Sequence, residues 1–451
     1  MILSRISGRS GALRALALLA IPGVLGGASA CQIDLPPLQA KGDAAGPDAA
    51  DAGADACIGC QDAAGEVGCP ANSVVLGAGR CCPANLELSL PGTYASGLLL
   101  QGDDAIVYGE RNGRAWAARV DRCDGAVLAE STDFVAQDGR IRGAALSGDQ
   151  LVLGGSYLVN GKDRWFAAWG SVATMTGFAV HQTTVTIPTI VSAVAVDSGA
   201  AWFAGTYRFG AAEARAMLAR VNLTDSTDCI SFPGGASGEG GGVFLDSGLL
   251  RFASKSNGRL YAASDDPNSC GILGGCKCGV AGALLDLDGR FVISTRAAAL
   301  HDGALYAVGG SATSAWPVSQ QGVYVARSNP DLSLAAKFIW VQPGNLIDDA
   351  RGVDVAGDGS VAVAVARGCS DLLLLGVQDC SFGAILGLPA NFDASSQPTF
   401  ATPLPDVNEV TGVRYEPEPS AGILVAANRY ASSYTPGSAT LMRCTRDGKC
   451  P

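Results

Sequence analysis

The chain has 451 residues, of which 48% are hydrophobic, only 16% are charged and 60 are glycine. This composition excludes a long-helix or coiled-coil protein, which is rich in Leu, Glu and Lys, and favours a β-rich globular fold. The formal net charge of -11 repels phosphate backbones, so the sequence predicts no nucleic-acid partner. Fifteen cysteines beside only two histidines indicate disulfides and therefore an oxidising compartment.

The first 30 residues have the order of a secretory signal peptide. Arg5, Arg9 and Arg14 precede an apolar run over residues 15–25, and small residues follow it. The apolar run is too short to remain as a membrane-spanning helix, and no later stretch is long enough to cross a bilayer. We therefore predict an exported protein whose residues 1–30 are removed.

The end of this segment, Ala28-Ser29-Ala30-Cys31, resembles a bacterial lipobox. The resemblance implies that Cys31 is acylated, and removing it leaves fourteen cysteines, enough for seven pairs. Ala28 stands where lipoproteins prefer leucine, and the same residues satisfy ordinary cleavage, so a secreted or periplasmic product is the alternative. Gln32 is not the aspartate of inner-membrane lipoproteins, which favours the outer membrane. Residues 31–56, almost all Ala, Asp, Gly and Pro, are predicted to be a flexible linker.

Seven similar segments follow one another along the rest of the chain. Each has a small residue, an alternating apolar stretch, a turn rich in Asp, Gly or Ser, and a second apolar stretch, which together predict a β-hairpin. Their starts lie 46, 50, 49, 55, 55 and 60 residues apart, and a second hairpin follows most of them. Four strands per repeat predict an all-β, seven-bladed β-propeller over residues 96–451; a six-bladed ring is the alternative because the fourth repeat is the weakest. The segments begin at Gly97, Gly143, Ala193, Gly242, Ala297, Gly352 and Gly412.

The order of hairpin, loop and hairpin, with turns rich in Asp, Asn and Gly, resembles the bacterial β-propeller repeat proteins of the SBBP type. The resemblance covers the chain from about Ser96 to the C-terminus and implies the fold, without a catalytic signature.

A propeller must also close its ring, because an unpaired edge strand is prone to aggregate. The Cys-rich segment 57–95 contains an alternating stretch, residues 85–90, that belongs to no repeat. We predict that this stretch supplies the outer strand of the last blade. The prediction also brings Cys81 or Cys82 close to Cys444 or Cys450.

The other cysteines raise the question of a metal or redox site. Cys57 and Cys60 have C-x-x-C spacing, and Cys276 with Cys278 could complete a four-thiolate set. Thioredoxin-type chemistry needs a βαβ unit, and structural zinc needs reduced thiols, so we predict disulfides, no metal and no cofactor. The predicted clips are Cys369 with Cys380, and Cys270 with Cys276 or Cys278.

No catalytic residue is predicted. The two histidines, His181 and His301, are not accompanied by a G-x-S-x-G elbow, and His301 falls in a predicted exposed turn. Adjacent acidic pairs are interpreted as turn and capping residues, and the Asp286–Gly289 stretch lacks the remaining ligands of a calcium loop. These pairs are at residues 103–104, 265–266 and 348–349.

The loops that join the two hairpins vary most between repeats, and equivalent loops project on one rim of a propeller. Trp316, Arg208 and Tyr434 are the candidate ligand-binding residues on this rim. Three other tyrosines recur at one register, which suits packing between blades better than recognition; they are Tyr157, Tyr207 and Tyr430.

The resulting hypothesis is an exported, lipid-anchored, non-enzymatic binding or scaffold module of the cell envelope that contacts a protein or a glycan. The alternative is a carbohydrate-active hydrolase or lyase with acidic residues at the propeller axis. A third hypothesis is an envelope component without a discrete ligand. Two axial carboxylates with raised pKa values would favour the enzyme. A channel of small apolar residues would favour binding.

Overall fold

The structure, a computed structural model, describes the chain from Cys69 onward with gaps. The described residues are 69–70, 73–76, 79–183, 188–197, 199–208, 214–231, 238–266, 281–315, 318–319, 321–341, 347–372, 377–417, 422–432 and 435–451. Contacts divide the chain into two units, Met1–Ile58 and Gly59–Pro451, and all described residues belong to the second. Outside the described residues lie the predicted signal peptide and linker, together with Cys31, Cys57 and Cys60.

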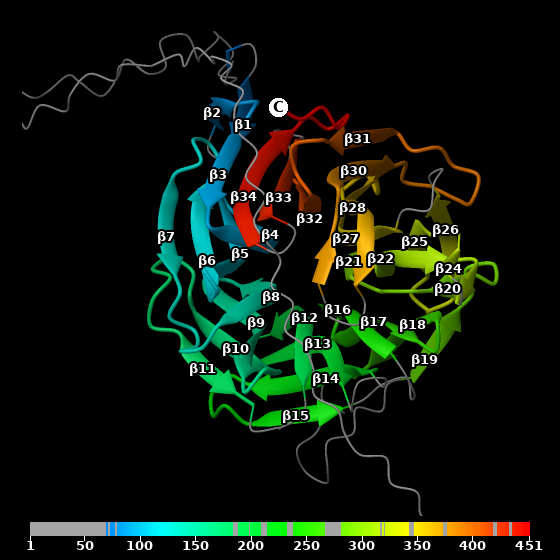
Figure 1. The fold of residues 1–451 in the computed structure, drawn as a ribbon, viewed down its shortest axis with the longest axis horizontal. Helices are drawn as coiled ribbons and strands as arrows, with labels where there is room; N and C mark the ends of the chain where they lie inside the picture. The colour runs from blue at the N-terminus through cyan, green and yellow to red at the C-terminus, as the bar shows by residue number, and fades with distance from the viewer. Residues whose placement is uncertain are drawn as a thin grey trace, which may run out of the picture. The chain divides into compact units, whose positions relative to one another are not determined.

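The described residues form an all-β fold of consecutive antiparallel sheets, and no α-helix is present among them. Figure 1 shows the sheets of the second unit following one another around a common centre, as in a β-propeller. The first sheet contains β4 (Thr93–Gln101), β5 (Asp104–Arg111), β6 (Arg114–Asp121) and β7 (Val127–Ser131). The second contains β8 (Gly139–Ser147), β9 (Gln150–Val159), β10 (Lys162–Ser171) and β11 (Ala179–Gln182). The third contains β12 (Thr189–Asp197), β13 (Ala200–Arg208), β14 (Ala214–Asn222) and β15 (Asp228–Ser231).

The fourth repeat, the weakest in sequence, also forms a complete sheet. It contains β16 (Gly238–Asp246), β17 (Leu249–Ser256), β18 (Arg259–Asp265) and β19 (Ala281–Leu285). The next sheet contains β20 (Phe291–Val292), β21 (Ala297–His301), β22 (Ala304–Ala312), β25 (Gly322–Ser328) and β26 (Leu334–Trp340). Two short hairpins stand apart: β1 (Ser73–Leu76) with β2 (Arg80–Pro83), and β23 (Ser314–Ala315) with β24 (Val318–Ser319).

The remaining strands form two groups that are joined by one bridging pair, Ala366 with Glu409. One group contains β27 (Ile347–Val355), β28 (Val361–Leu372), β30 (Phe382–Leu388) and β31 (Phe400–Leu404), with β29 (Val377–Asp379) paired to β28. The other contains β32 (Glu409–Tyr415), β33 (Ile423–Ser432), β34 (Thr435–Cys444) and, from the N-terminal side, β3 (Glu87–Pro91).

The small residue that begins each repeat segment has a structural reason. In β4, β8, β12, β16, β27 and β32 a register shift precedes it, so one residue bulges out of the ladder. Just after the bulge, neighbouring sheets approach closely. A Cβ atom on Gly143 would lie 2.8 Å from the Cα atom of Ala193, and one on Gly412 would lie 3.2 Å from that of Gly97. Only glycine or alanine fits where the first strands converge.

The hydrophobic core lies between adjacent sheets. Ile106 of the first sheet and Leu151 of the second belong to one buried cluster, and Trp165 of the second packs with Phe203 of the third in another. Each sheet therefore buries its apolar faces only against its neighbours, as repeat architectures do. Tyr157 and Tyr207 belong to these clusters, which confirms their packing interpretation.

The ring is closed by the N-terminal segment. β3 pairs with β34 from Glu87 opposite Met442 to Pro91 opposite Ser438, which confirms the pairing predicted for residues 85–90. Figure 1 shows β3, near the blue end of the chain, beside the red β34. Buried Asn428 of β33 accepts a hydrogen bond from the Ala95 N–H (2.8 Å) and donates to its carbonyl (2.9 Å), which ties the last sheet to the first.

A buried ionic cluster reinforces this closure. Glu416, whose side chain is 0% exposed, accepts hydrogen bonds from Arg443 Nε (2.8 Å) and Nη2 (2.9 Å) and from Arg122 Nη1 (3.1 Å). Arg443 also donates to the carbonyl of Pro83 (2.7 Å), so the cluster joins the last sheet, the first sheet and the segment before β3. Because each charge has its partners, the cost of burying it is offset.

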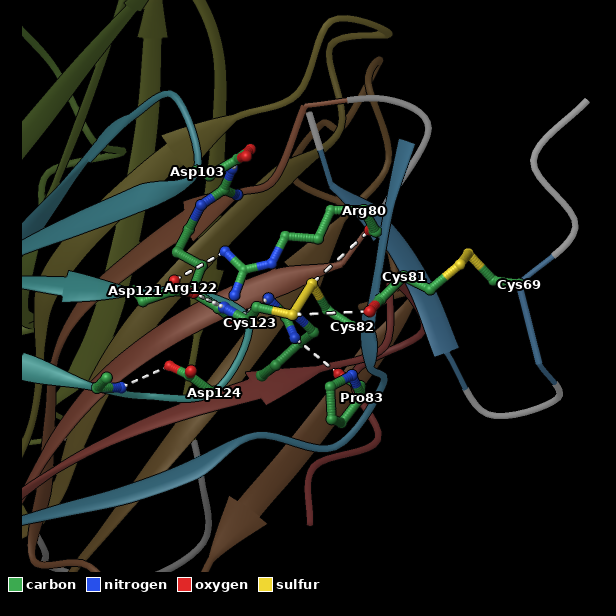
Figure 2. Close-up of a disulfide and its surroundings, with 12 residues drawn as sticks. Cys69, Arg80, Cys81, Cys82, Pro83, Asp103, Asp121, Arg122, Cys123 and Asp124 are labelled. Atoms are coloured by element: carbon green, nitrogen blue, oxygen red, sulfur yellow. Dashed lines mark hydrogen bonds and ion pairs between the residues drawn. A yellow bond between two sulfur atoms is a disulfide. The ribbon is translucent and has the colours of Figure 1, made fainter. Parts of the chain in front are cut away.

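The described disulfides do not bond Cys81 or Cys82 to Cys444 or Cys450, the residues predicted to lie close together. Figure 2 shows Cys82 bonded to Cys123, in the turn after β6, and Cys81 bonded to Cys69. Cys444 bonds instead to Cys450, six residues further on. The segments still meet, through Pro83 and Arg443, but backbone pairing and the ionic cluster join them rather than a disulfide between the two ends.

Disulfide bonding extends to Cys229 and Cys380. The side chain of Cys369 lies outside those described, as do Cys270, Cys276 and Cys278, so the predicted clips stay predictions. The bonds that are described indicate an oxidising environment, extracellular or periplasmic.

Candidate functional site

A cavity of about 610 Å³ lies where the first strands of the sheets converge. Its walls come from β4, β8, β12, β16, β21, β27 and β32, so it occupies the axis of the propeller. A volume in the range of about 300–1,000 Å³ suits a small-molecule ligand or a short stretch of polymer.

The β-bulges determine which side chains face this cavity. The bulged residue of each strand leaves the ladder, and all six such residues line the cavity. They are Ser96, Arg142, Ser192, Gly241, Arg351 and Thr411. In six of the first strands, one irregular position thus places a residue at the axis.

The polar part of the cavity lies near the edge that carries the inter-hairpin loops. Thr93, at the start of β4, pairs with Arg111 at the end of β5, which pairs in turn with Arg114 at the start of β6. The start of each first strand and the loop between second and third strands therefore share one edge. Arg140 and Arg142 stand in the first half of β8, and Arg208 is the last residue of β13.

A chain of ion pairs runs along one wall. Asp349, only 3% exposed, accepts hydrogen bonds from Arg296 Nε (2.9 Å) and Ser294 Oγ (2.6 Å), and Arg351 Nε lies 3.6 Å from it. Burial alone would raise the pKa of Asp349, but these partners outweigh it and hold the pKa below the usual value. Arg351 also lies 4.0 Å from Glu409.

Two tyrosines complete this wall. Tyr430 donates a hydrogen bond to Glu409 Oε1 (2.6 Å), and Asn428 Nδ2 lies 3.3 Å from the same oxygen. The guanidinium of Arg140 lies 4.0 Å from the ring centroid of Tyr94, in cation–π geometry. Burial, together with the negative charge of Glu409, raises the pKa values of Tyr94 and Tyr430 well above the usual phenol value. Both are therefore hydrogen-bond donors and neutral at physiological pH.

Arg142 differs from the other half-buried arginines that line the cavity. Arg140 is bound by Glu110 (2.6 Å), and Arg296 and Arg351 share Asp349. Among the described residues Arg142 has no carboxylate within 4.0 Å, and its one side-chain hydrogen bond is to Ser156 Oγ at 3.5 Å. Burial, reinforced by repulsion from Arg140, lowers the pKa of Arg142 to about 10, so it remains a cation at neutral pH.

The predicted ligand-binding residues are only partly described. Arg208 is exposed and lines the axial cavity, whereas Trp316 and Tyr434 lie outside the described residues. Tyr430, which the sequence analysis assigned to packing with Tyr157 and Tyr207, lines the cavity and binds Glu409.

The histidines are not brought together. His181 Nε2 lies 3.1 Å from Asp228 of the neighbouring sheet, and its ring lies 5.5 Å from that of Trp165. His301 ends β21 and is half-buried rather than exposed.

The turn interpretation holds for the Asp286–Gly289 stretch and is wrong for one of the acidic pairs, residues 348–349. Asp286 accepts a hydrogen bond from the Gly289 N–H (2.9 Å), as a turn residue does. Asp348 and Asp349, by contrast, are both buried within β27. Since adjacent strand residues face opposite sides, Asp348 pairs with Arg367 (3.3 Å) while Asp349 meets the arginines of the axial wall.

Sequence reasoning looked for the site in the rim loops and missed the bulged residues. The signal was nevertheless present in the repeat: the residue before the small residue of each segment reads Ser, Arg, Ser, Gly, Arg, Arg and Thr in turn. It varies more in size and charge than its alternating neighbours, as expected of a position that faces a cavity.

Within the described residues, no group of three or more His, Cys, Asp or Glu side chains could hold a metal ion. The same part of the chain contains no helix with the length and hydropathy needed to span a membrane.

No protein-family model matches this chain, and no curated protein matches it either. Solved structures resemble it at low identity. The polysaccharide lyase Uly1 is 9% identical over 78% of this chain and 90% of its own, with a TM-score of 0.47. Drosophila Semaphorin 2a is 8% identical over 81% of this chain and 76% of its own, with a TM-score of 0.49. A Synechocystis apocarotenoid oxygenase mutant is 10% identical over 73% and 74%, with a TM-score of 0.42. Likeness at this level carries no argument about what this chain binds or catalyses.

Proposed function

We propose that this chain is a ligand-binding module of the cell envelope that holds its ligand in the axial cavity and does not transform it. The observation that carries the proposal is the lining itself. Charged and hydroxyl-bearing side chains from every sheet converge on one cavity of about 610 Å³, at the edge that carries the most variable loops. Convergent polar groups in a preformed cavity are the usual mark of a small-ligand site.

The lining differs from the channel of small apolar residues considered from the sequence, because arginines, carboxylates and hydroxyl groups converge on it. Asp349 has a lowered pKa and serves as a counter-ion for two arginines, so it is a poor general acid. A lyase that used a tyrosine as its base would need a lowered phenol pKa. Tyr94 and Tyr430 have raised pKa values, which favours binding over catalysis.

The architecture that we propose for the module is a seven-bladed propeller of the SBBP type. Each of the seven repeat segments contains the first strand of a separate group of strands, from β4 to β32. We further propose that residues 1–30 are removed on export and that Cys31 is acylated, which tethers the propeller to the outer membrane through residues 31–56.

A binding screen on the mature chain, combined with product analysis, tests the proposal. Purified protein is applied to arrays of acidic and neutral glycans and to envelope proteins, and each bound ligand is re-isolated for mass determination. We expect bound ligands to be recovered unchanged. Recovery of shortened or unsaturated glycans would make the protein an enzyme and overturn the proposal. Intact mass determination of protein from its native membrane tests acylation of Cys31.

A further inference from the structure

We propose that the ligand of the axial cavity is an acidic sugar, and that Arg142 binds its carboxylate. This inference rests on the proposed binding function and names the chemical class that the cavity accepts. Three observations support the proposal: Arg142 has no carboxylate partner, hydroxyl groups line the same cavity, and the backbone holds Arg142 in position.

Arg142 is the exception among the half-buried arginines that line the cavity. Carboxylates lie within 4.0 Å of the other half-buried lining arginines: Glu110 for Arg140, Asp349 for Arg296 and Arg351, and Asp354 for Arg414. Arg208 also lacks one among the described residues, but it is exposed to solvent. Arg142 has none among the described residues. Asp163 also lines the cavity and attracts Arg142, but it stays beyond that distance.

A half-buried guanidinium without a counter-ion loses hydration without gaining an ion pair, and this costs free energy. The same cost appears in its lowered pKa, because burial and the neighbouring Arg140 both disfavour the charged form. An anion in the cavity would restore the missing partner. The planar, forked guanidinium matches a carboxylate in particular, since two parallel N–H groups can meet its two oxygens.

The position of Arg142 is built into the backbone. It is the bulged residue of β8, between Ile141 and Gly143 in the ladder with β9. Close contact of Gly143 with Ala193 prevents the bulge from relaxing into the next sheet. The guanidinium is therefore presented to the cavity by a rigid strand rather than by a mobile loop, which is what a specific anion site requires.

The rest of the lining suits a polyhydroxylated ligand. Hydroxyl groups of Ser96, Ser192, Thr206 and Thr411 come from three parts of the ring, and Tyr430 stands beside them. Ser96 Oγ has no hydrogen-bond partner among the described residues. A sugar ring presents several hydroxyls that both donate and accept, so it can pair with more of these dispersed groups than a small inorganic anion, whose oxygens lie close together. The joint presence of cation and hydroxyls thus favours a uronic acid.

Isothermal titration calorimetry on the mature chain tests this inference with three probes: a glucuronic-acid disaccharide, the corresponding neutral glucose disaccharide and inorganic phosphate. We expect the acidic disaccharide to bind most tightly, with an affinity that falls as NaCl is added. Arg142→Gln is expected to weaken it by about 10- to 100-fold, the usual loss for a charge-assisted hydrogen-bonded pair. Arg142→Lys, which keeps the charge without the fork, is expected to lie between.

Arg259→Gln is the matched control, because Arg259 is exposed on β18, outside the cavity, and the net charge changes equally. It should leave binding unchanged. Thermal unfolding establishes that each variant is folded. If Arg142→Gln does not fold, Arg142→Lys still tests the inference.

Equal binding of the acidic and neutral disaccharides, equal binding of phosphate, or unaltered binding by Arg142→Gln would each overturn the inference. In those cases a ligand still binds and is not chemically altered, so the proposed function stands. Conversion of the acidic disaccharide to products would instead refute the proposed function itself.

Discussion

The buried carboxylate that joins the two ends of the ring gives the sharpest prediction about stability. Glu416→Gln keeps the shape of the side chain but removes the only carboxylate that binds Arg443 and Arg122 at 2.8–3.1 Å among the described residues. The side chains of both arginines are at most 3% exposed, so neither can regain water easily. Removing one partner from a buried ion pair costs about 3–5 kcal/mol, and we expect a loss of unfolding free energy of this size.

Glu87→Gln is the matched control. Glu87 of β3 pairs with Arg429 of β33 at 3.0 Å, so it also joins the N-terminal strand to the last sheet, but the two side chains are 44% and 38% exposed. An exposed pair contributes about 0–1 kcal/mol and is screened by salt. We therefore expect a small loss for Glu87→Gln that disappears in about 1 M NaCl, and a large loss for Glu416→Gln that persists.

Urea denaturation at equilibrium, followed by tryptophan fluorescence, measures both variants. A change in midpoint at constant slope reports the change in stability. If Glu416→Gln lowers the unfolding free energy by less than about 1 kcal/mol, or by no more than Glu87→Gln, the buried cluster does not hold the ring closed and the reasoning fails.

Two further predictions concern the first strands. Gly143→Ala should destabilise the protein by about 1–3 kcal/mol in the same assay, because the added methyl meets the backbone of Ala193 at 2.8 Å; Gly199→Ala, with open space around it, is the control, and equal effects would contradict the close-approach argument. Asp349 has a lowered pKa in the folded state, so its stabilisation is present above the unfolded value of about 3.9 and is lost as the pH falls through the folded value. Asp349→Asn should flatten the dependence of stability on pH below about 4, and an unchanged dependence would show that Asp349 does not contribute.

The sequence was sufficient for the parts of the fold that repeat. Alternation and turn residues located the first strand of each sheet, and residues 85–90 were correctly paired with the C-terminal strand because they alternate and belong to no repeat. These features depend on local pattern, which each segment carries by itself.

The candidate site depends on geometry that local pattern does not contain. Arg142 faces the axis because its strand bulges there, and a strict alternation of faces would not single it out. Asp348 and Asp349 look like a turn pair, yet they lie within a strand because an arginine is available on each side of the sheet. Cys82 meets Cys123 only once β2 is placed against the first sheet, and many cysteine pairings are compatible with one sequence.

The pairing of β3 with β34 has a consequence for how the protein is made. β3 precedes the first sheet and β34 belongs to the last, so the propeller cannot close until β34 has been synthesised. Until then the sheets that have already formed have an open edge, where unpaired backbone groups invite association with other chains. A chaperone that shields such edges would matter most for this protein in the interval before β34 is available.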